Sequence, residues 1–285
     1  MAFIDVSSVS KTFRTGRAVR CVLENVTLSV DRGEFVSIVG FMGCGKSTLL
    51  TIIAGLIRPD EGDVRFGGEL VSGVRPKTAI VFQNYSLLPW LTALENVQLA
   101  VASAWPLWAR DRQDNQARCY LGKVGLSNAA QRRPGQLSGG MRQRVAIARA
   151  LATEPDVLFL DDPFGALDAL TRANLQQELA QLCSAEQRPV TTIMITNSVE
   201  EALLLSDRIV PMTHGPRATL GRPVTVAIPK PRTLAQLTHD KEAMHSRAHV
   251  VESLTASVRR PRRPQFNPEP VEDIGLSAVP NRSGA

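Results

Sequence analysis

The nine-residue stretch GFMGCGKST, from Gly40 to Thr48, constrains the fold of this 285-residue chain more than any other feature. It matches the pattern G-x-x-x-x-G-K-[ST], follows the apolar run EFVSIVG, and precedes KSTLLTIIAGLI, in which leucine and isoleucine recur at helical spacing. A glycine turn between a strand and a helix directs successive backbone N–H groups at an anion near the positive end of the helix. The stretch therefore predicts a phosphate-binding loop in an α/β fold. The plainer interpretation, a glycine turn with a capping serine, would make the full pattern and its context a coincidence.

The residue types in this loop suit the phosphates of a nucleotide. Its glycines allow backbone angles and a close approach that a Cβ would prevent. Lys46 is placed to neutralise β and γ phosphates, and the Ser47 hydroxyl is a suitable ligand for Mg²⁺. The candidate nucleotide-binding residues of the loop are Gly40, Phe41, Met42, Gly43, Cys44, Gly45, Lys46, Ser47 and Thr48.

The apolar run DVLFLD ends in Asp161, a carboxylate of the kind that a magnesium ion beside the loop requires. Ligands of a parallel sheet gather at the carboxyl ends of its strands, so Asp161 and the loop are expected to meet there. An aspartate after a strand is otherwise most often a helix cap or a turn residue. Beside this loop, we favour a metal-binding role for Asp161 together with Ser47.

Short apolar runs alternate with helix-like stretches along the chain. The runs EFVSIVG, TAIVFQ, DVLFLD and TTIMIT are apolar at consecutive positions, which predicts a parallel sheet covered by helices on both faces. Between about residues 86 and 154 the pattern is helical, which indicates a helical subdomain inserted between strands. From Gly215 onward core-like runs disappear except for one possible helix, Thr233 to Leu254, and we expect roughly the last thirty residues to be disordered.

Composition excludes several classes of protein. No apolar run approaches the roughly 20 residues that cross a bilayer, and the first residues lack the pattern of a signal peptide. The four cysteines are scattered, which predicts neither a disulfide nor a structural zinc site. The net charge of +6 is spread along the chain apart from RRPRR, Arg259 to Arg263, so we expect a solvated surface with a basic tail and no nucleic-acid partner. Contact of that tail with anionic lipid stays open. No internal repeat is visible, which predicts one nucleotide-binding unit.

The stretch LSGGMRQRVAIARALATEPDVLFLDDPFGALDALTR, Leu137 to Arg172, resembles the signature-to-Walker-B block of ATP-binding cassette (ABC) ATPases. The resemblance extends from about Phe3 to about Pro216. It implies a P-loop NTPase fold, with a RecA-like parallel-sheet core, an antiparallel edge sheet and the inserted helical subdomain, over residues 1–220. Residues 221–285 would form a C-terminal extension. ATP and Mg²⁺ are the implied ligands.

The same resemblance assigns further site residues. Phe13 would stack on adenine, although a lone phenylalanine near a strand is more often a core residue. Gln83 would be the Q-loop residue, with a catalytic and metal-binding role, and Asp168 would end the D-loop. The signature residues Ser138, Gly139 and Gly140 also form an anion-binding helix start on physical grounds. In ABC ATPases they grip the γ-phosphate of ATP held by the opposite subunit, which implies a head-to-tail dimer.

Within the family, the chain is similar to the ATPases of nitrate, sulfonate, taurine and cyanate importers, and MTHGP followed by IPKPRT favours the nitrate-type branch. The resemblance implies transmembrane permease subunits and a second ABC ATPase as partners, a solute-binding protein indirectly, and a peripheral position at the cytoplasmic face of the inner membrane. The segment NYSLLPWLTALENV, Asn84 to Val97, would contact the permease. Its apolar residues also suit an ordinary core.

Three residues depart from the family pattern around the γ-phosphate. Asp162 stands where the family has the catalytic Glu, and it is shorter by a reach on the order of 1 Å, which can cost about a hundredfold in rate. Asn197 replaces the switch His, and losing such a donor typically costs about 10² to 10³. Met42 replaces a Ser that contacts phosphate, and we expect only a modest loss of ATP affinity there because backbone amides form most of the cradle. We predict a slow hydrolytic site, although Asp162 and Asn197 could also compensate for each other.

Several functions remain in competition on this sequence. The first is an energy-coupling importer ATPase, in which Asp162, Asn197 and Gln83 are the candidate catalytic residues. The second is a subunit that clamps ATP and hydrolyses almost none, beside a competent partner ATPase. A heterodimer would then have one strong and one weak site, and a homodimer two weak ones. A soluble ABC protein acting on ribosomes or DNA is disfavoured, because such chains usually carry two cassettes or a long coiled-coil insertion.

Overall fold

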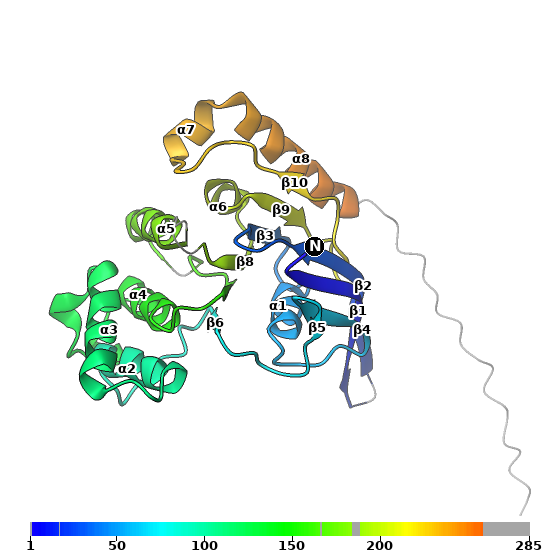
Figure 1. Ribbon diagram of the computed structural model, residues 1–285. Coiled ribbons are helices and arrows are strands. Elements are labelled where there is room, and N and C mark those ends of the chain that lie inside the picture. The colour runs from blue at the N-terminus through cyan, green and yellow to red at the C-terminus, as the bar shows by residue number, and fades with distance from the viewer. Residues whose placement is uncertain (1, 17, 166, 184–188, 259–285) are drawn as a thin grey trace, which may run out of the picture.

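The computed structural model describes residues 2–16, 18–165, 167–183 and 189–258, which form two β-sheets and several layers of helices (Figure 1). The four-stranded sheet is antiparallel and has the order β2-β1-β4-β5. Its strands are β1 (Ile4–Thr15), β2 (Ala18–Val30), β4 (Glu61–Phe66) and β5 (Glu69–Leu70). The six-stranded sheet has the order β10-β9-β3-β8-β7-β6. Its strands are β3 (Phe35–Val39), β6 (Thr78–Val81), β7 (Val157–Asp161), β8 (Thr191–Thr196), β9 (Arg208–Pro211) and β10 (Val224–Thr225).

The six-stranded sheet is the predicted parallel core. β3 pairs in parallel with β8 and β9, and β7 pairs in parallel with β6 and β8, whereas β10 runs antiparallel to β9. All five residues of β3 and all six of β8 are buried, as expected for strands covered on both faces. The fold-class prediction, including the antiparallel second sheet, is therefore confirmed.

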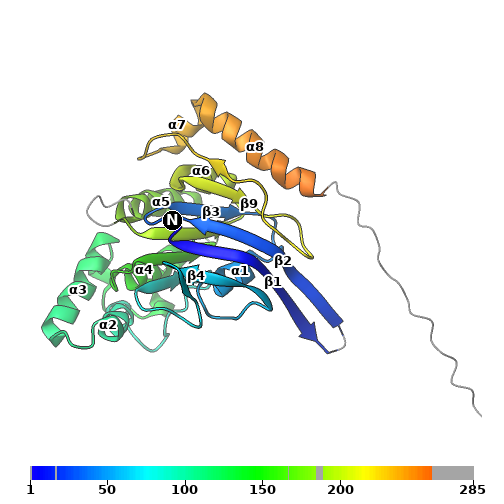
Figure 2. The ribbon, with the colours of Figure 1, turned by 45° about the vertical axis from the view of Figure 1, so that its right-hand side comes forward.

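One hydrophobic core lies between the two sheets. Helix α1 (Lys46–Ile53) contributes Leu49, Leu50, Ile52 and Ile53, which pack with residues from β1, β2, β3, β7 and β8. The apolar spacing predicted a longer helix, but Gly55 has a φ of 77° and the next residue, Leu56, is exposed. Figure 2 shows α1 beneath the antiparallel sheet, whose β1–β2 hairpin projects from the body.

The helical subdomain lies between β6 and β7 in the chain and appears grouped on one side in Figure 1. It consists of α2 (Ala93–Ala104), α3 (Arg110–Lys123) and α4 (Gly139–Leu151), with 3₁₀ turns at Ser127–Ala129 and Pro134–Gln136. These helices enclose a separate core that includes Val97, Leu121 and Val145. The start of α2 is fixed by a capping box between Thr92 and Glu95. An inserted helical subdomain is thus present, as the sequence predicted.

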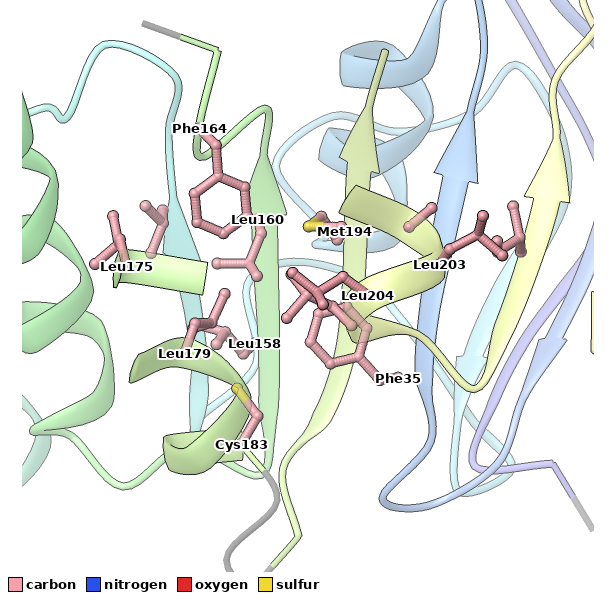
Figure 3. Close-up of a cluster of buried hydrophobic side chains, with 14 of the residues drawn as sticks. Phe35, Leu158, Leu160, Phe164, Leu175, Leu179, Cys183, Met194, Leu203 and Leu204 are labelled. Carbon is pink, nitrogen blue, oxygen red and sulfur yellow. The ribbon is translucent and has the colours of Figure 1, made fainter. Parts of the chain in front are cut away.

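The other face of the parallel sheet is covered by α5 (Ala169–Cys183), α6 (Val199–Leu205), α7 (Leu234–His239) and α8 (Lys241–Val258). Figure 3 shows the hydrophobic cluster on this face, which we call the second cluster. In it, Leu158, Leu160 and Met194 of the sheet pack with Leu175 of α5 and Leu203 of α6. Within the described ranges, no helix is long and apolar enough to cross a bilayer.

The C-terminal segment differs from the expectation in two respects. The single helix predicted from Thr233 to Leu254 is two helices, because Asp240 is non-helical and its Oδ1 accepts a hydrogen bond from Ala243 N at 2.9 Å. Core residues also occur outside the predicted helical stretch, since the isolated Val224 and Val226 are buried in the second cluster beside Leu237, Ala243 and Val250 of that stretch. Residues 259–285, including the cluster from Arg259 to Arg263, lie outside the described residues.

Candidate active site

A cavity of about 430 Å³ lies where the glycine-rich loop meets the carboxyl ends of β7 and β8. The predicted site residues that line it are Phe13, Met42, Gly43, Gly45, Lys46, Ser47, Thr48, Gln83, Asp161, Asp162 and Asn197. The structure therefore brings together residues from five separate segments of the chain. The cavity is also lined by three residues that were not among the predicted site residues, Arg20, Val22 and Ile195.

Lys46 is held inside the loop by three oxygen acceptors. Its Nζ donates to Gly40 O at 2.8 Å, Phe41 O at 2.9 Å and Asn197 Oδ1 at 2.8 Å. Burial lowers the pKa of Lys46, whereas nearby Cys44, Asp162 and Asp161 raise it. The lysine thus sits in a polar cage at the base of the cavity, where a bound anion would favour its charged form.

The backbone of the loop requires glycine at its last turn. Gly45 has a φ of 115°, and a Cβ there would lie 2.8 Å from Val22 Cγ1. Cys44 is buried behind the loop and does not line the cavity, and Gly40 and Phe41 contribute carbonyl oxygens to Lys46. Gly40 and the side chains of Phe41 and Cys44 are therefore not placed against a ligand in the cavity.

Ser47, Asp161 and Gln83 provide oxygen atoms of the type that Mg²⁺ prefers. Ser47 Oγ donates to Asp161 Oδ1 at 3.1 Å, so the two predicted metal ligands are already adjacent. Burial raises the pKa of Asp161, the Ser47 hydrogen bond lowers it, and the neighbouring Asp162 raises it again. Two carboxylates crowded in this way fit a cation between them and a phosphate. No cluster of three or more His, Cys, Asp or Glu suited to a metal occurs among the described residues, so phosphate or water would have to complete this shell.

Asp162 is fixed in an unusual backbone conformation. Its φ is 44°, a left-handed value that aspartate adopts more readily than most residues, and its N–H donates to Ile195 O at 2.9 Å. Gln83 Nε2 donates to Asp162 Oδ2 at 3.3 Å. Burial raises the pKa of Asp162, while Lys46 and Arg172 lower it. A carboxylate whose pKa is raised toward neutrality is a better base, provided that its oxygen reaches the water it must activate.

Asn197 lies directly after β8 and faces the loop. Because lysine only donates, the contact with Lys46 Nζ requires the oxygen of the Asn197 amide, which leaves Nδ2 as the group able to donate to a phosphate. Asn197 and Asp162 line the same cavity as Lys46. The three residues that would act on a γ-phosphate are thus together.

The protein-family model described as "ABC transporter" matches residues 23–165, about half of the chain. A bicarbonate transport ATP-binding protein of Synechocystis sp., CmpD, is 44% identical over 253 residues, which cover 89% of each chain. The chain belongs to the ABC transporter family. A nitrate import ATP-binding protein of Synechococcus elongatus, NrtD, is 45% identical over 252 residues, which cover 88% of this chain and 91% of that one.

Other relatives and solved structures of ABC proteins agree with this placement. The bicarbonate transport ATP-binding protein CmpC of Synechococcus elongatus is 45% identical over 258 residues, and the match covers 90% of this chain but 39% of CmpC. The dimeric structure of a post-hydrolysis state of the ATP-binding cassette MJ0796 bound to ADP and Pi aligns with a TM-score of 0.71 and 33% identity, over 79% of this chain and 99% of that one. The fold and the family are those of ATP-binding ABC ATPases.

The signature and D-loop residues of this ABC chain lie away from its own cavity. Ser138 begins α4 and its Oγ accepts from Met141 N at 3.3 Å, whereas Asp168 Oδ1 accepts from Thr171 N at 3.0 Å at the start of α5. Neither these two residues nor Gly139 and Gly140 line the cavity. Ser138 and Asp168 are exposed, so their polar groups are accessible to a second chain.

Phe13 is 41% exposed at the mouth of the cavity, on β1 of the antiparallel sheet. Its partner across the β1–β2 hairpin is Arg20, which explains why that arginine reaches the cavity. The Phe13 ring is therefore available for stacking and is not part of the buried core. The register of the β1–β2 hairpin would have identified Arg20, but the connection between the two strands has no recognisable turn motif from which to predict that register.

Proposed function

We propose that this chain is the ATP-binding, energy-coupling subunit of an ABC importer, and that its own site hydrolyses ATP slowly. The observation that carries the proposal is the single cavity in which Lys46, Ser47, Asp161, Asp162 and Asn197 meet. The importer would carry a small inorganic or organic anion, because relatives that match along most of the chain act in bicarbonate transport and nitrate import.

ATP binding relies on groups that are already oriented. Lys46 keeps two backbone acceptors while its contact with Asn197, a side chain able to move, gives way to phosphate oxygens. Ser47, Asp161 and Gln83 would hold Mg²⁺, which neutralises charge on the phosphates when it is bound. Phe13 would stack on the base at the cavity mouth. Met42 occupies the family's serine position and removes one hydroxyl donor.

Slow hydrolysis follows from the positions of two side chains. Asp162 must activate the attacking water with a carboxylate shorter than the family Glu, and a displacement of about 1 Å can cost about a hundredfold. Asn197 Nδ2 supplies one neutral hydrogen bond where the family has an imidazole that can become cationic. These losses do not multiply, because both groups act on one water and one phosphate.

The exposed signature residues support a head-to-tail dimer. Ser138 and Asp168 lie outside the chain's own cavity, so they would complete the site of a partner ATPase. In a heterodimer this chain would supply a family-type signature to a competent partner, while its own cavity would form the weak site. A clamp that binds ATP and turns over almost none is the second candidate function, and it is supported by the same Asp162 and Asn197.

Docking to a permease is supported by the segment before α2. The side chain of Asn96 is 1% exposed, and its Nδ2 donates to Leu88 O, Leu91 O and Thr92 O at 2.9 to 3.3 Å. This pins the segment while Trp90 remains 65% exposed. A fixed backbone with an exposed aromatic side chain suits a partner surface at the membrane.

The proposal is tested by Mg²⁺-dependent ATP turnover and ATP affinity of the purified chain beside the double variant D162E/N197H. We expect tight ATP binding in both proteins and a turnover at least about a hundredfold higher in the double variant. The double variant D63E/N174H, with the same two substitutions outside the cavity, is the matched control. Because a Glu at φ 44° is strained, N197H alone is measured as well.

Two results would contradict the slow-site proposal. Turnover of the unaltered chain near or above about 1 s⁻¹, with no gain in the double variant, would make Asp162 a fully working carboxylate. An unaltered chain that binds ATP no more tightly than the variant K46A would contradict the ATP-binding function itself. Adding a competent partner ATPase distinguishes the importer subunit from the clamp. With the partner present, an importer subunit should show transport-coupled turnover in both sites of the dimer, whereas a clamp should not.

A further inference from the structure

A closed ring of hydrogen bonds shapes the turn that carries Asn197. Ser198 N donates to Thr196 Oγ1 at 3.1 Å, Thr196 Oγ1 donates to Glu201 Oε2 at 2.5 Å, and Glu201 N donates to Ser198 Oγ at 3.3 Å. Asn197 lies between Thr196 and Ser198, and its side chain points away from the ring: Asn197 Oδ1 accepts a hydrogen bond from Lys46 Nζ at 2.8 Å. The turn from which the Asn197 side chain projects is therefore fixed by the residues on both sides of it.

The Glu201 carboxylate connects this ring to the start of α5. Glu201 is 5% exposed, and its Oε1 lies 3.8 Å from Arg172 Nε. Arg172 Nη2 donates in turn to Leu167 O at 3.1 Å, next to Asp168. A continuous path of contacts thus runs from the segment that includes Asp168 to the residue that contacts Lys46.

Arg172 also acts on the other carboxylate of the site. Its charge lowers the pKa of both Asp162 and Glu201, and Asp162 in turn raises the pKa of Glu201. The guanidinium is therefore shared electrostatically by the candidate base and by the carboxylate that orients Asn197. A movement of Arg172 changes the surroundings of both.

The geometry of the Arg172–Glu201 pair is not that of a contact optimised for stability. At 3.8 Å the pair is outside hydrogen-bond distance, and Arg172 Nε is a buried donor without a hydrogen-bond partner. The pair is only half buried, because the Arg172 side chain is 39% exposed and the Glu201 side chain 6%, and a partly solvated ion pair of this geometry contributes little to stability. A small movement of the segment around Leu167 toward α6 would close the pair.

We propose that Glu201 and Arg172 are positioning residues for hydrolysis, which hold Asn197 in place and couple its orientation to the segment Leu167–Asp168. A second chain that contacts the exposed Asp168 would shift Arg172, tighten its bond to Glu201, and pass the shift through Thr196 to Asn197. This inference rests on the proposed function, because dimer contact and turnover are parts of it. It adds a route by which contact at the dimer interface changes the orientation of Asn197 within one chain.

The test compares variants that each change one side chain of the path. T196V removes the hydroxyl while keeping the shape, T196S keeps it, E201Q removes the charge, and R172Q removes the cation. E178Q is the matched control, since Glu178 lies on α5 and faces Arg144 at 3.5 Å without contact to the turn. ATP turnover, ATP affinity and amide hydrogen exchange at Ser198 and Glu201 are measured for each.

We expect T196V, E201Q and R172Q to lower turnover by about tenfold or more, with ATP affinity unchanged within about twofold, because Lys46 retains its carbonyl anchors. T196S and E178Q should behave as the unaltered chain. R172Q should also speed exchange at Ser198 and Glu201, although Arg172 is not a member of the ring. A purely structural role would instead lower stability and leave the remaining folded molecules with normal turnover.

The inference is overturned if E201Q and R172Q keep normal turnover, if E178Q loses as much as they do, or if T196S fails to restore what T196V loses. Should the unaltered chain show no turnover at all, the hydrolytic part of the proposed function fails by itself. The exchange measurement then decides the linkage separately: unchanged exchange at Ser198 in R172Q removes it, and faster exchange supports it.

Discussion

Gly140 lies where the signature helix α4 approaches the start of α5 most closely, and replacing it with alanine tests that packing. A Cβ on Gly140 would lie 2.3 Å from Thr171 Cγ2, whereas carbon atoms in contact are normally about 3.5 to 4.0 Å apart. Thr171 cannot turn its methyl away freely, because its side chain also hydrogen-bonds Asp168. The helices would have to separate by about 1 Å.

The expected magnitude combines two opposing effects. Overpacking a close contact costs about 1 to 3 kcal/mol, and replacing a helical glycine with alanine recovers up to about 1 kcal/mol. G140A should therefore lower the free energy of unfolding by about 1 to 2 kcal/mol, or the melting temperature by about 3 to 6 °C. G122A is the control: its Cβ would meet Ser127 Oγ at 3.4 Å, an ordinary contact, so it should be neutral or stabilising.

Urea unfolding followed by circular dichroism measures G140A, T171S and the double variant. T171S removes Cγ2, which leaves the Cβ and Oγ1 positions of residue 171 at 3.5 and 3.6 Å from the new methyl, so the double variant should be at least as stable as T171S alone. Equal losses in G140A and in the double variant, beyond that of T171S, would refute the steric explanation and point to a direct need for glycine in the helix start.

Four further outcomes are expected. At pH 8, exposed Cys119 should react with a thiol reagent while Cys183 does not, because burial raises the pKa of Cys183 from 9.0 to about 11; mass spectrometry of labelled peptides checks this. The folded chain holds the Cys183 thiol proton more tightly than the unfolded chain does. The stability that results, on the order of 3 kcal/mol, is complete below about pH 9 and is lost as pH rises through 11. Urea unfolding measures this stability, which should be absent in C183A. R232M should lower the free energy of unfolding by at least about 3 kcal/mol, since Arg232 donates to four backbone carbonyls, three of them in buried hydrogen bonds, including Leu203 O at 2.7 Å; an unchanged urea midpoint would contradict this. W90S should leave ATP turnover of the purified chain unchanged and reduce transport in a reconstituted importer; lower turnover in the purified chain would instead give Trp90 a structural role.

Much of the fold was readable from strands that are buried on both faces. The run TTIMIT coincides with β8, and DVLFLD differs from β7 by one residue, because uninterrupted apolar runs are needed only where helices cover a strand on each side. The break at Asp240 was missed because a single aspartate inside a periodic pattern gives no signal until its cap is seen. Val224 and Val226 are isolated in sequence, and only their packing against the sheet and its helices makes them core residues.

The residues of the candidate site also differ in whether they could be predicted from the sequence. Residues within contiguous motifs, such as Lys46 and Asp161, could be predicted because the chemistry and the spacing lie in one stretch. The Arg172–Glu201 pair could not, since its two residues are distant along the chain and charged residues show no period. Arg20 would have required the register of the β1–β2 hairpin, in which it pairs with Phe13. The roles assigned to Asp162 and Asn197 remain predictions that the proposed measurements address.

The order of strands in the parallel sheet has a consequence for synthesis on the ribosome. β3 pairs only with β8 and β9 among the described residues, so Val36 waits for Ile193, 157 residues later, before its ladder can form. At 5 to 20 residues per second, a strand that is fully buried in the folded chain stays unpaired, with its adjoining loop, for about 10 to 30 s. The helical subdomain, whose contacts are local, can form during that interval. Nascent chains should therefore depend on chaperone protection of Phe35–Val39, and slower translation before β8 should increase aggregation and not relieve it.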